Sequence, residues 1–161
     1  MIPSFTIETP SLADSSFIFE LFQKQFNFHH NLDSFYFIPL SQDLEKKIKI
    51  NIRNAITQNT PYIKIARSQE KIIGFITYKE DESEYFDSNI QEHGVIIELY
   101  VDTSQRQHGI GKALVKSAES FFKSKGHKHI LLTASSQNIP AAKFYKKEAF
   151  KEHLKTFIKE I

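Results

Sequence analysis

One short segment of the sequence has the residue types that bind phosphate. Arg106–Gly111 reads Arg-Gln-His-Gly-Ile-Gly and joins the apolar stretch Val95–Val101 to a helical pattern that begins near Ile110. A helix N-terminus presents free backbone N–H groups and the positive end of the helix dipole. Glycines let a phosphate approach that backbone closely, and Arg106 adds a fixed positive charge. The segment therefore predicts a phosphate-binding turn, with glycines that serve only the packing of the corner as the alternative.

The Gly-x-Gly pair does not belong to either of two well-known phosphate loops. The sequence has no GxxxxGK[ST], and GxGxxG fails because Leu114 stands at its last position. Instead, Arg106–Gly111 resembles motif A of the GNAT superfamily, the acyl-CoA-dependent N-acyltransferases, whose pattern is Arg/Gln-x-x-Gly-x-Gly/Ala. The run Asn138–Phe150 resembles motif B of that family, except that Ala149 replaces the usual glycine. Because that glycine normally ends the helix at positive φ, we expect the corner to close differently here.

The resemblance implies an N-acetyltransferase that moves an acetyl group from acetyl-CoA to a primary amine of a small molecule or peptide. The amine would attack directly within a ternary complex, with coenzyme A as co-substrate and no metal. The family's central strand splays from its neighbour, which frees backbone N–H groups for the cofactor. The residues that the resemblance assigns to cofactor binding are Leu99, Tyr100, Val101, Arg106, Gln107, His108, Gly109, Ile110, Gly111, Lys112, Asn138 and Tyr145.

Glu98 is the candidate general base. Acetyl transfer needs a neutral amine, and an alkylamine with a pKa near 10.4 must first lose a proton. Glu98 interrupts an apolar strand, where a charge is costly unless it is paired or used, and the resemblance puts an acidic base at or beside this position. A Glu98 paired with a lysine, His93 as the base, and a water chain remain as alternatives. Tyr100 shares the face of Glu98 by period-two alternation and is placed to order such a water.

The resemblance also assigns the remaining chemical roles. Tyr145 stands at the family's general-acid position and would protonate the departing thiolate, whereas packing beside Phe144 is its structural alternative. A backbone N–H near Val101 would stabilise the oxyanion. Asn138 would contact the cofactor or cap the following helix, since either role uses the same side chain.

The seven histidines do not suggest a metal site. His29 and His30 are adjacent, so they cannot both point the same way in regular structure, and no set of His, Asp and Glu has zinc-protease spacing. With the aromatic residues of Asn27–Leu40, the histidine pair either lines the acceptor cleft or packs as a loop on the sheet.

Composition narrows the class of protein. The 161 residues predict a single domain, 1–161, that is large enough for a core. There is no cysteine, which excludes disulfides, thiolate metal sites and a cysteine nucleophile. No leader pattern and no long apolar run are visible, so we expect a cytoplasmic protein without a membrane partner. Oligomeric state is open, and a homodimer is compatible with the sequence.

Charge is unevenly divided along the chain. Residues 103–161 carry a net charge of +8 and residues 1–102 a net charge of −6. The basic half suits a polyphosphate cofactor, and its scattered lysines lack the aromatic interleaving of nucleic-acid binders. The acidic half would build the acceptor side from its helix pair, Asn27–Leu40 and the acidic loop Glu80–Asp87. We therefore expect a cationic amine, with a merely solvated loop as the alternative.

The pattern of elements predicts an α/β (α+β) fold with a mixed, mostly antiparallel central sheet flanked by helices on both faces. This is also the family's order. The expected elements are strand Phe5–Glu8, helix Ser11–Phe26, a helix from Ser41 to about Thr57, a hairpin of Pro61–Arg67 and Ile72–Lys79, strand Val95–Val101, a helix from Ile110 to Gly126, strand 129–134, a helix after Asn138, and a last strand Lys151–Ile158.

Two other functions compete with catalysis. One is a regulatory module that binds acyl-CoA without turning it over, which intact Glu98 and Tyr145 argue against. The other is a nucleic-acid binder that uses the basic half, which would bind nonspecifically and release at moderate salt.

Overall fold

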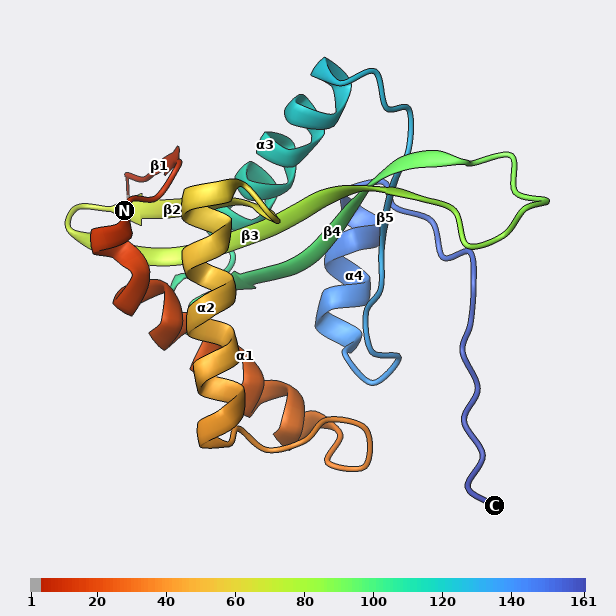
Figure 1. Cartoon of the computed structure of the whole chain (residues 1–161), viewed down its shortest axis with the longest axis horizontal. Helices are drawn as coiled ribbons and strands as arrows, with labels where there is room; N and C mark the ends of the chain where they lie inside the picture. Colours follow the sequence, from red (N-terminus) through yellow and green to blue (C-terminus); the bar gives the residue numbers. More distant parts are fainter. Residues whose placement is uncertain (1–3) are drawn as a thin grey trace.

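A computed structural model describes residues 4–161 and places a five-stranded sheet at the centre of the chain (Figure 1). The strands lie in sequence order; the first four pair antiparallel, and the last joins its neighbour in parallel. They are β1 (Thr6–Glu8), β2 (Tyr62–Ser68), β3 (Lys71–Glu82), β4 (Glu92–Val101) and β5 (Ile130–Leu132).

Two of the described helices, α2 and α4, begin at a residue whose side chain caps them. The Ser41 side chain accepts a hydrogen bond from the N–H of Leu44, and the Asn138 side chain accepts one from the N–H of Ala141. Each bond satisfies a donor that a helix start leaves free. The helices are α1 (Ser15–Leu32), α2 (Gln42–Gln58), α3 (Ile110–Ser124) and α4 (Ile139–Lys147), with short 3-10 turns at Leu12–Asp14 and Thr103–Gln105.

Strand alternation divides the core into two layers. Phe75 of β3 packs with Ile18 of α1 and Ile52 of α2, whereas the next residue, Ile76, packs with Leu114 of α3. Because neighbouring side chains in a strand point to opposite faces, the two helix layers cover opposite sides of the sheet (Figure 1). The expected mixed sheet with helices on both faces is confirmed.

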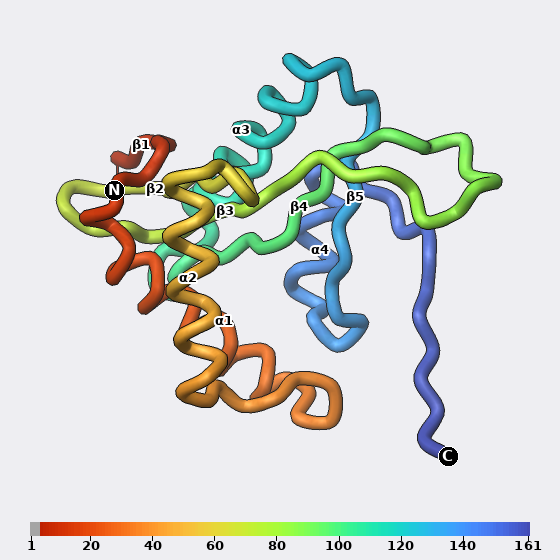
Figure 2. The backbone as a smooth tube through the Cα atoms, in the orientation of Figure 1, coloured from red at the N-terminus to blue at the C-terminus, as the bar shows by residue number. Residues whose placement is uncertain are grey.

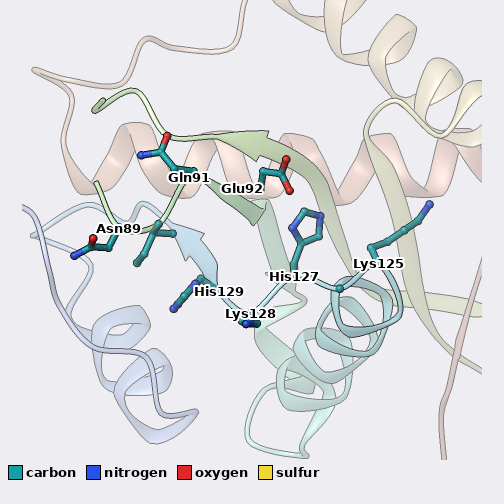
Figure 3. A pocket seen from close by; sticks show the side chains of 9 residues that line it. Asn89, Gln91, Glu92, Lys125, His127, Lys128 and His129 are labelled. Atoms are coloured by element: carbon teal, nitrogen blue, oxygen red, sulfur yellow. The ribbon is translucent and has the colours of Figure 1, made fainter. Parts of the chain in front are cut away.

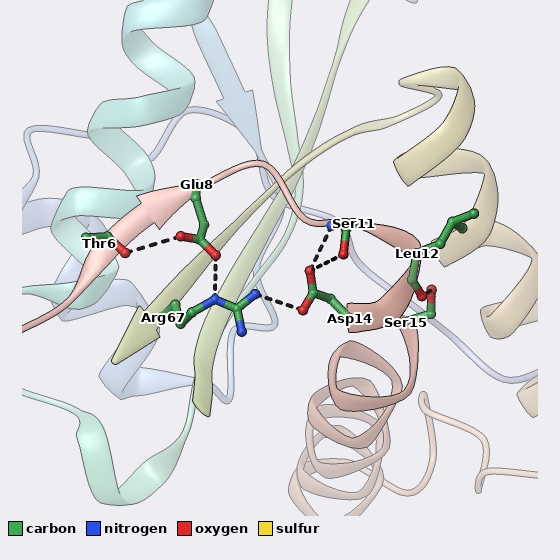
Figure 4. Close-up of polar contacts among 7 residues, drawn as sticks. All are labelled: Thr6, Glu8, Ser11, Leu12, Asp14, Ser15 and Arg67. Carbon is green, nitrogen blue, oxygen red and sulfur yellow. Dashed lines mark hydrogen bonds and ion pairs between the residues drawn. The ribbon is translucent and has the colours of Figure 1, made fainter. Parts of the chain in front are cut away.

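A cluster of ion pairs fixes where α1 begins (Figure 4). Arg67 of β2 pairs with Glu8 of β1 and with Asp14 at the start of α1, and Asp14 accepts hydrogen bonds from the backbone and side chain of Ser11. Burial alone would raise the pKa of Asp14, but the hydrogen bonds from Arg67 and Ser11 outweigh it and lower that pKa. The cluster holds the first turn of α1 against the sheet, and the rest of the helix runs from there across β3 and β4.

Helix α1 is longer than expected. It continues six residues beyond the predicted end at Phe26, to Leu32. No glycine or proline occurs between residues 11 and 38, so nothing in the local chemistry stops the helix earlier. His29 and His30 therefore lie in its last turn and not in an irregular loop.

The last predicted strand, Lys151–Ile158, is wrong. Residues 151–161 form no strand and extend away from the sheet (Figure 2). Leu154 and Phe157 would fall on opposite faces of a strand, so pairing could not bury both on one side of a sheet. Phe157 accordingly remains 89% exposed.

No helix in residues 4–161 is both long enough and apolar enough to cross a membrane.

Candidate active site

Strands β4 and β5 separate halfway along β4. Only Gly94, Val95 and Ile96 pair with β5, so Ile97–Val101 has no strand neighbour on that side among residues 4–161. At the same point Ile97 has no partner in β3, which makes it a β-bulge. The splay that the family resemblance implied is thus present.

The bulge determines which backbone groups face the gap. The N–H of Gly94 donates to His129 on the β5 side, whereas the N–H of Asp102 donates to Ile73 of β3. Since N–H groups alternate sides along an antiparallel strand, the extra residue at the bulge turns the N–H groups of Leu99 and Val101 toward the gap. The N–H of Tyr100 faces β3. Two of the three predicted strand positions therefore present donors to the opening.

The predicted phosphate turn, Arg106–Gly111, comes shortly after the end of β4 in the chain. Gly109 caps α3 with φ 80°, and Gln107 also has a positive φ of 67°. The first helical hydrogen bond joins Ala113 N–H to the Gly109 carbonyl, so the N–H groups of residues 110–112 lie free at the helix start. A Cβ on Gly109 would meet nothing within 4 Å, which leaves open space above the turn.

Gly111 has a different role from Gly109. A Cβ built on Gly111 would come within 3.2 Å of the Phe144 ring of α4. Gly111 therefore allows α3 and α4 to approach each other, so the packing alternative applies to this glycine.

Arg106 folds back toward the strand. Its Nε donates to the carbonyl of Val101 at 3.0 Å, and its guanidinium lies 5.7 Å from the Phe28 ring and 5.6 Å from the Tyr100 ring. These contacts fix the turn to the end of β4 and to α1. The positive charge thus lies beneath the turn, between β4 and α1.

Glu98 lies on the face of β4 that α1 covers. Its Oε2 accepts a hydrogen bond of 2.6 Å from Gln25 Nε2. Burial raises the pKa of Glu98 to about 7, although the hydrogen bond from Gln25 opposes that rise. No lysine pairs with Glu98 in residues 4–161, so no ion pair offsets the effect of burial on the pKa of Glu98.

Tyr145 faces the same region from α4. Its ring packs edge-on against Phe144 and Phe150, with centroid distances of 5.2 and 5.6 Å. Burial raises the pKa of Tyr145 to about 12, and the negative charge of Glu98 adds to the rise. The gap between β4 and β5 thus brings the predicted acid and the predicted base within electrostatic reach of each other.

The end of α1 borders this site. Asp33, just beyond α1, accepts a hydrogen bond of 2.9 Å from Gln137, which lies in the loop between β5 and α4. His29 stacks on Phe37 at 4.9 Å, and burial lowers its pKa. His30 contacts the carbonyl of Phe37. The histidine pair thus lies where α1 meets the α4 side.

Of the other predicted residues, His93 does not lie beside Glu98 and Asn138 has a structural role. His93 is buried at the far end of β4, five residues from Glu98, which is roughly 16 Å along a strand. Asn138 caps α4. No group of three potential metal ligands occurs in residues 4–161.

The expectation that the corner after α4 closes differently from the family's glycine corner, because Ala149 replaces the glycine, is wrong. Ala149 adopts φ 67°, the left-handed geometry that a glycine would take. The N–H of Phe150 bonds the carbonyl of Tyr145, which closes the helix end in the ordinary way.

A separate hollow of about 360 Å³ lies near the C-terminal end of α3 (Figure 3). Its lining includes Gln91, Glu92, His127 and His129, and His127 is paired with Glu80. This hollow is at the His93 end of β4, away from the phosphate turn.

Sequence reasoning missed Gln25 as a site residue. It lies in the buried stripe of α1 beside Ile18 and Leu21, and an amide in an apolar stripe is the signal that was available.

The chain resembles known acetyltransferases in sequence and in structure. Residues 17–150 match the family model described as Acetyltransferase (GNAT) family. A human protein, N-acetyltransferase 8, is 27% identical over 94 residues, which are 58% of this chain and 40% of that protein. The chain thus spans less than half the length of this relative.

Solved structures share the fold over nearly the whole chain. An aminoglycoside acetyltransferase from an uncultured soil metagenomic sample, in complex with trehalose, has a TM-score of 0.65 and 25% identity and covers 98% of this chain and 96% of its own. A predicted acetyltransferase with acetyl-CoA from Clostridium acetobutylicum has a TM-score of 0.72 and 18% identity, with the same coverage.

Proposed function

The chain belongs to the GNAT acetyltransferase family, and on that premise we propose that it transfers an acetyl group from acetyl-CoA to a primary amine of a small molecule or peptide. The observation that carries the proposal is that Glu98, whose pKa is about 7, lies close enough to Tyr145 for its charge to raise the pKa of that phenol, beside strand N–H groups that have no strand partner. Acetyl transfer needs these three elements together.

The residues around the gap suit acetyl-CoA. The N–H groups of Leu99 and Val101 are free to bond an extended amide arm as a neighbouring strand would. The free N–H groups at the start of α3 and the open space at Gly109 suit a pyrophosphate. Arg106 contributes charge from beneath the turn, and Gln107, His108, Ile110 and Lys112 supply the rest of the turn and the first helical residues.

Glu98 removes the proton that prevents attack. A carboxyl with a pKa of about 7 is partly ionised at neutral pH, and its basicity is better matched to an ammonium group than that of an ordinary glutamate. The amine nitrogen then attacks the thioester carbonyl, the N–C bond forms, and the C–S bond breaks. The N–H of Val101 is placed to stabilise the oxyanion, directly or with Leu99.

Tyr145 supplies the proton that the thiolate takes. With a pKa of about 12 its hydroxyl is protonated at neutral pH, yet that value makes it a weak acid toward a thiolate whose thiol has a pKa near 8.5. Proton uptake by Glu98 removes the negative charge that helps to raise the pKa of Tyr145. Deprotonation of the amine thus makes Tyr145 a stronger acid at the step that needs it.

Between the two classes of acceptor in the proposal, a small molecule is better supported than a peptide. Aminoglycoside acetyltransferases are among the structural neighbours, one of them at 25% identity over nearly the whole chain. A protonated amine suits the ionised form of Glu98. The acidic loop Glu80–Asp87 contributes less negative charge to the acceptor side than the sequence suggested, because Glu80 pairs with His127 and Asp81 pairs with Lys79.

An acceptor panel tests the proposal. The protein is incubated with acetyl-CoA and amines of each class, namely aminoglycosides, polyamines, small metabolites and peptide termini, while thiol release and the acetylated product are followed. We expect amine-dependent thiol release and intersecting initial-rate patterns, since both substrates must be bound together. Acetyl-CoA binding without turnover on any amine would favour the idle acyl-CoA-binding module, and parallel rate patterns would indicate an acetyl-enzyme.

A further inference from the structure

Gln25 is a polar residue in an apolar environment. It lies on the sheet-facing side of α1, within the stripe that contains Ile18 and Leu21, and only 4% of it is exposed. Buried amides normally satisfy both their donor and their acceptor groups.

Only half of this amide is satisfied. Nε2 donates to Glu98 Oε2 at 2.6 Å, but Oε1 has no hydrogen-bond partner and is the one such buried side-chain atom in residues 4–161. An unpaired buried acceptor lowers stability. A methionine of similar length would fill the space without that loss, so packing alone does not account for a glutamine here.

We propose that Gln25 is a positioning residue for Glu98, whose carboxylate it holds by one oxygen so that the other is directed to the acceptor amine. The hydrogen bond fixes the rotation of the carboxylate and favours its ionised form. The role as base rests on the proposed function; the coupling between the two side chains does not.

Replacing Gln25 removes none of the other titratable or charged side chains near Glu98. Tyr145 faces it from α4, Tyr100 shares its face of β4, and the Arg106 guanidinium lies over the Tyr100 ring. His29 lies one turn further along α1, and burial lowers its pKa. A change in the titration of Glu98 on replacing Gln25 therefore reports the missing amide.

The test compares Gln25→Met with Gln23→Met. Gln23 is a matched control because it lies on the same helix and its amide also donates to a carboxylate, Glu45, at 3.2 Å. The pKa of Glu98 is measured by NMR of its side-chain carboxyl carbon in the ligand-free protein, with assignment by Glu98→Gln.

We expect Gln25→Met to raise the pKa of Glu98 by about one unit and Gln23→Met to leave it unchanged. The acidic limb of kcat/KM against pH should move upward by the same amount for the same acceptor. Because the amide favours the ionised carboxylate, the stability that Gln25→Met loses relative to the wild type should be smaller at about pH 5 than at about pH 8.

An unchanged pKa of Glu98 in folded Gln25→Met would overturn the inference. If that variant does not fold, Gln25→Asn withdraws the amide by one methylene, and the same pKa shift supports the inference while its absence overturns it. If the shift occurs but the wild-type protein acetylates no amine, the positioning contact stands and the proposed function fails.

Discussion

Glu98 holds its carboxyl group in a buried position, where ionisation lowers the stability of the folded state. A folded-state pKa of about 7 against an ordinary 4.5 means that the native state holds the proton more tightly than the unfolded state. Stability therefore falls as pH rises from about 4.5 to 7, and the accumulated loss above that window is about 3 kcal/mol.

Glu98→Gln tests this cost. The variant removes the titration, so its free energy of unfolding should vary less between pH 4.5 and 8 and should exceed that of the wild type at about pH 8. Urea unfolding at several pH values measures this. Parallel curves for the two proteins would mean that Glu98 has an ordinary pKa and is not the buried base.

Tyr145→Phe isolates the hydroxyl from the ring. The ring packing on Phe144 and Phe150 is retained, while the hydroxyl that we propose as the proton donor to the thiolate is lost. We expect kcat to fall by roughly 10²-fold or more, with acetyl-CoA affinity nearly unchanged, because the hydroxyl acts mainly in the transition state. Steady-state kinetics with calorimetry checks both, and an unchanged kcat would remove Tyr145 from the rate-limiting chemistry.

At this scale the sequence points to single side chains more readily than to their contacts. Glu98 is a candidate because a charge interrupts an apolar strand, and Tyr145 is a candidate because a motif marks it. Gln25 lies 73 residues from Glu98 in sequence, so only the path of α1 across the sheet brings the two together.

Two glycines, one at each end of α3, provide a matched pair of variants for testing the predicted phosphate turn. Gly109 and Gly126 have φ of 80° and 88°, and a Cβ on either meets nothing within 4 Å. Valine at either position incurs similar backbone strain. Gly109→Val should weaken acetyl-CoA binding at least tenfold, about 1.4 kcal/mol, whereas Gly126→Val should lose only stability. Equal acetyl-CoA affinities by calorimetry would show that the turn does not hold the cofactor.

The end of α4 carries strain that glycine would relieve. Ala149 has a positive φ of 67° and makes the left-handed corner despite its Cβ. Ala149→Gly should raise the free energy of unfolding by about 0.5–1 kcal/mol, because the strain relieved exceeds the added chain entropy. Ala142→Gly, inside α4, should instead lower it by about 1 kcal/mol. Urea titration compares them, and a loss of stability in both variants would show that Ala149 is not strained.

Elements with strong local signals were predicted well, and elements that depend on context were not. Ser41 marks the start of α2 and Asn138 that of α4, as the cap chemistry indicates. The end of α1 had no local stop signal. The strand predicted at Lys151–Ile158 required a sheet neighbour, which local sequence cannot supply.

At the scale of the whole molecule, the acidic loop Glu80–Asp87 lies far from Glu98. Glu82 pairs with Glu92, six residues from Glu98 along β4, which is roughly 20 Å in an extended strand. That separation exceeds the screening length of about 10 Å at 0.1 M salt. The charge difference between the two halves of the chain therefore does not by itself predict steering of the acceptor.

Neutralising two carboxylates of the acidic loop tests whether the loop steers the acceptor. The double variant Glu82→Gln, Glu84→Gln should leave KM for the best acceptor, and its response to salt, within about twofold of the wild type. A KM that rises several-fold at low salt in the double variant would restore the acidic loop as the steering element.

The central claim is that Glu98 and Tyr145, beside the gap between β4 and β5, carry out acetyl transfer. The most direct measurement is the rate of amine-dependent thiol release by wild type and Glu98→Gln, with acetyl-CoA affinity measured for both by calorimetry. We predict equal affinities and a turnover that falls roughly 10²-fold or more in the variant, because the general base is lost. Equal turnover in the two proteins, or acetyl-CoA binding by the wild type with no thiol release on any amine, would contradict the account.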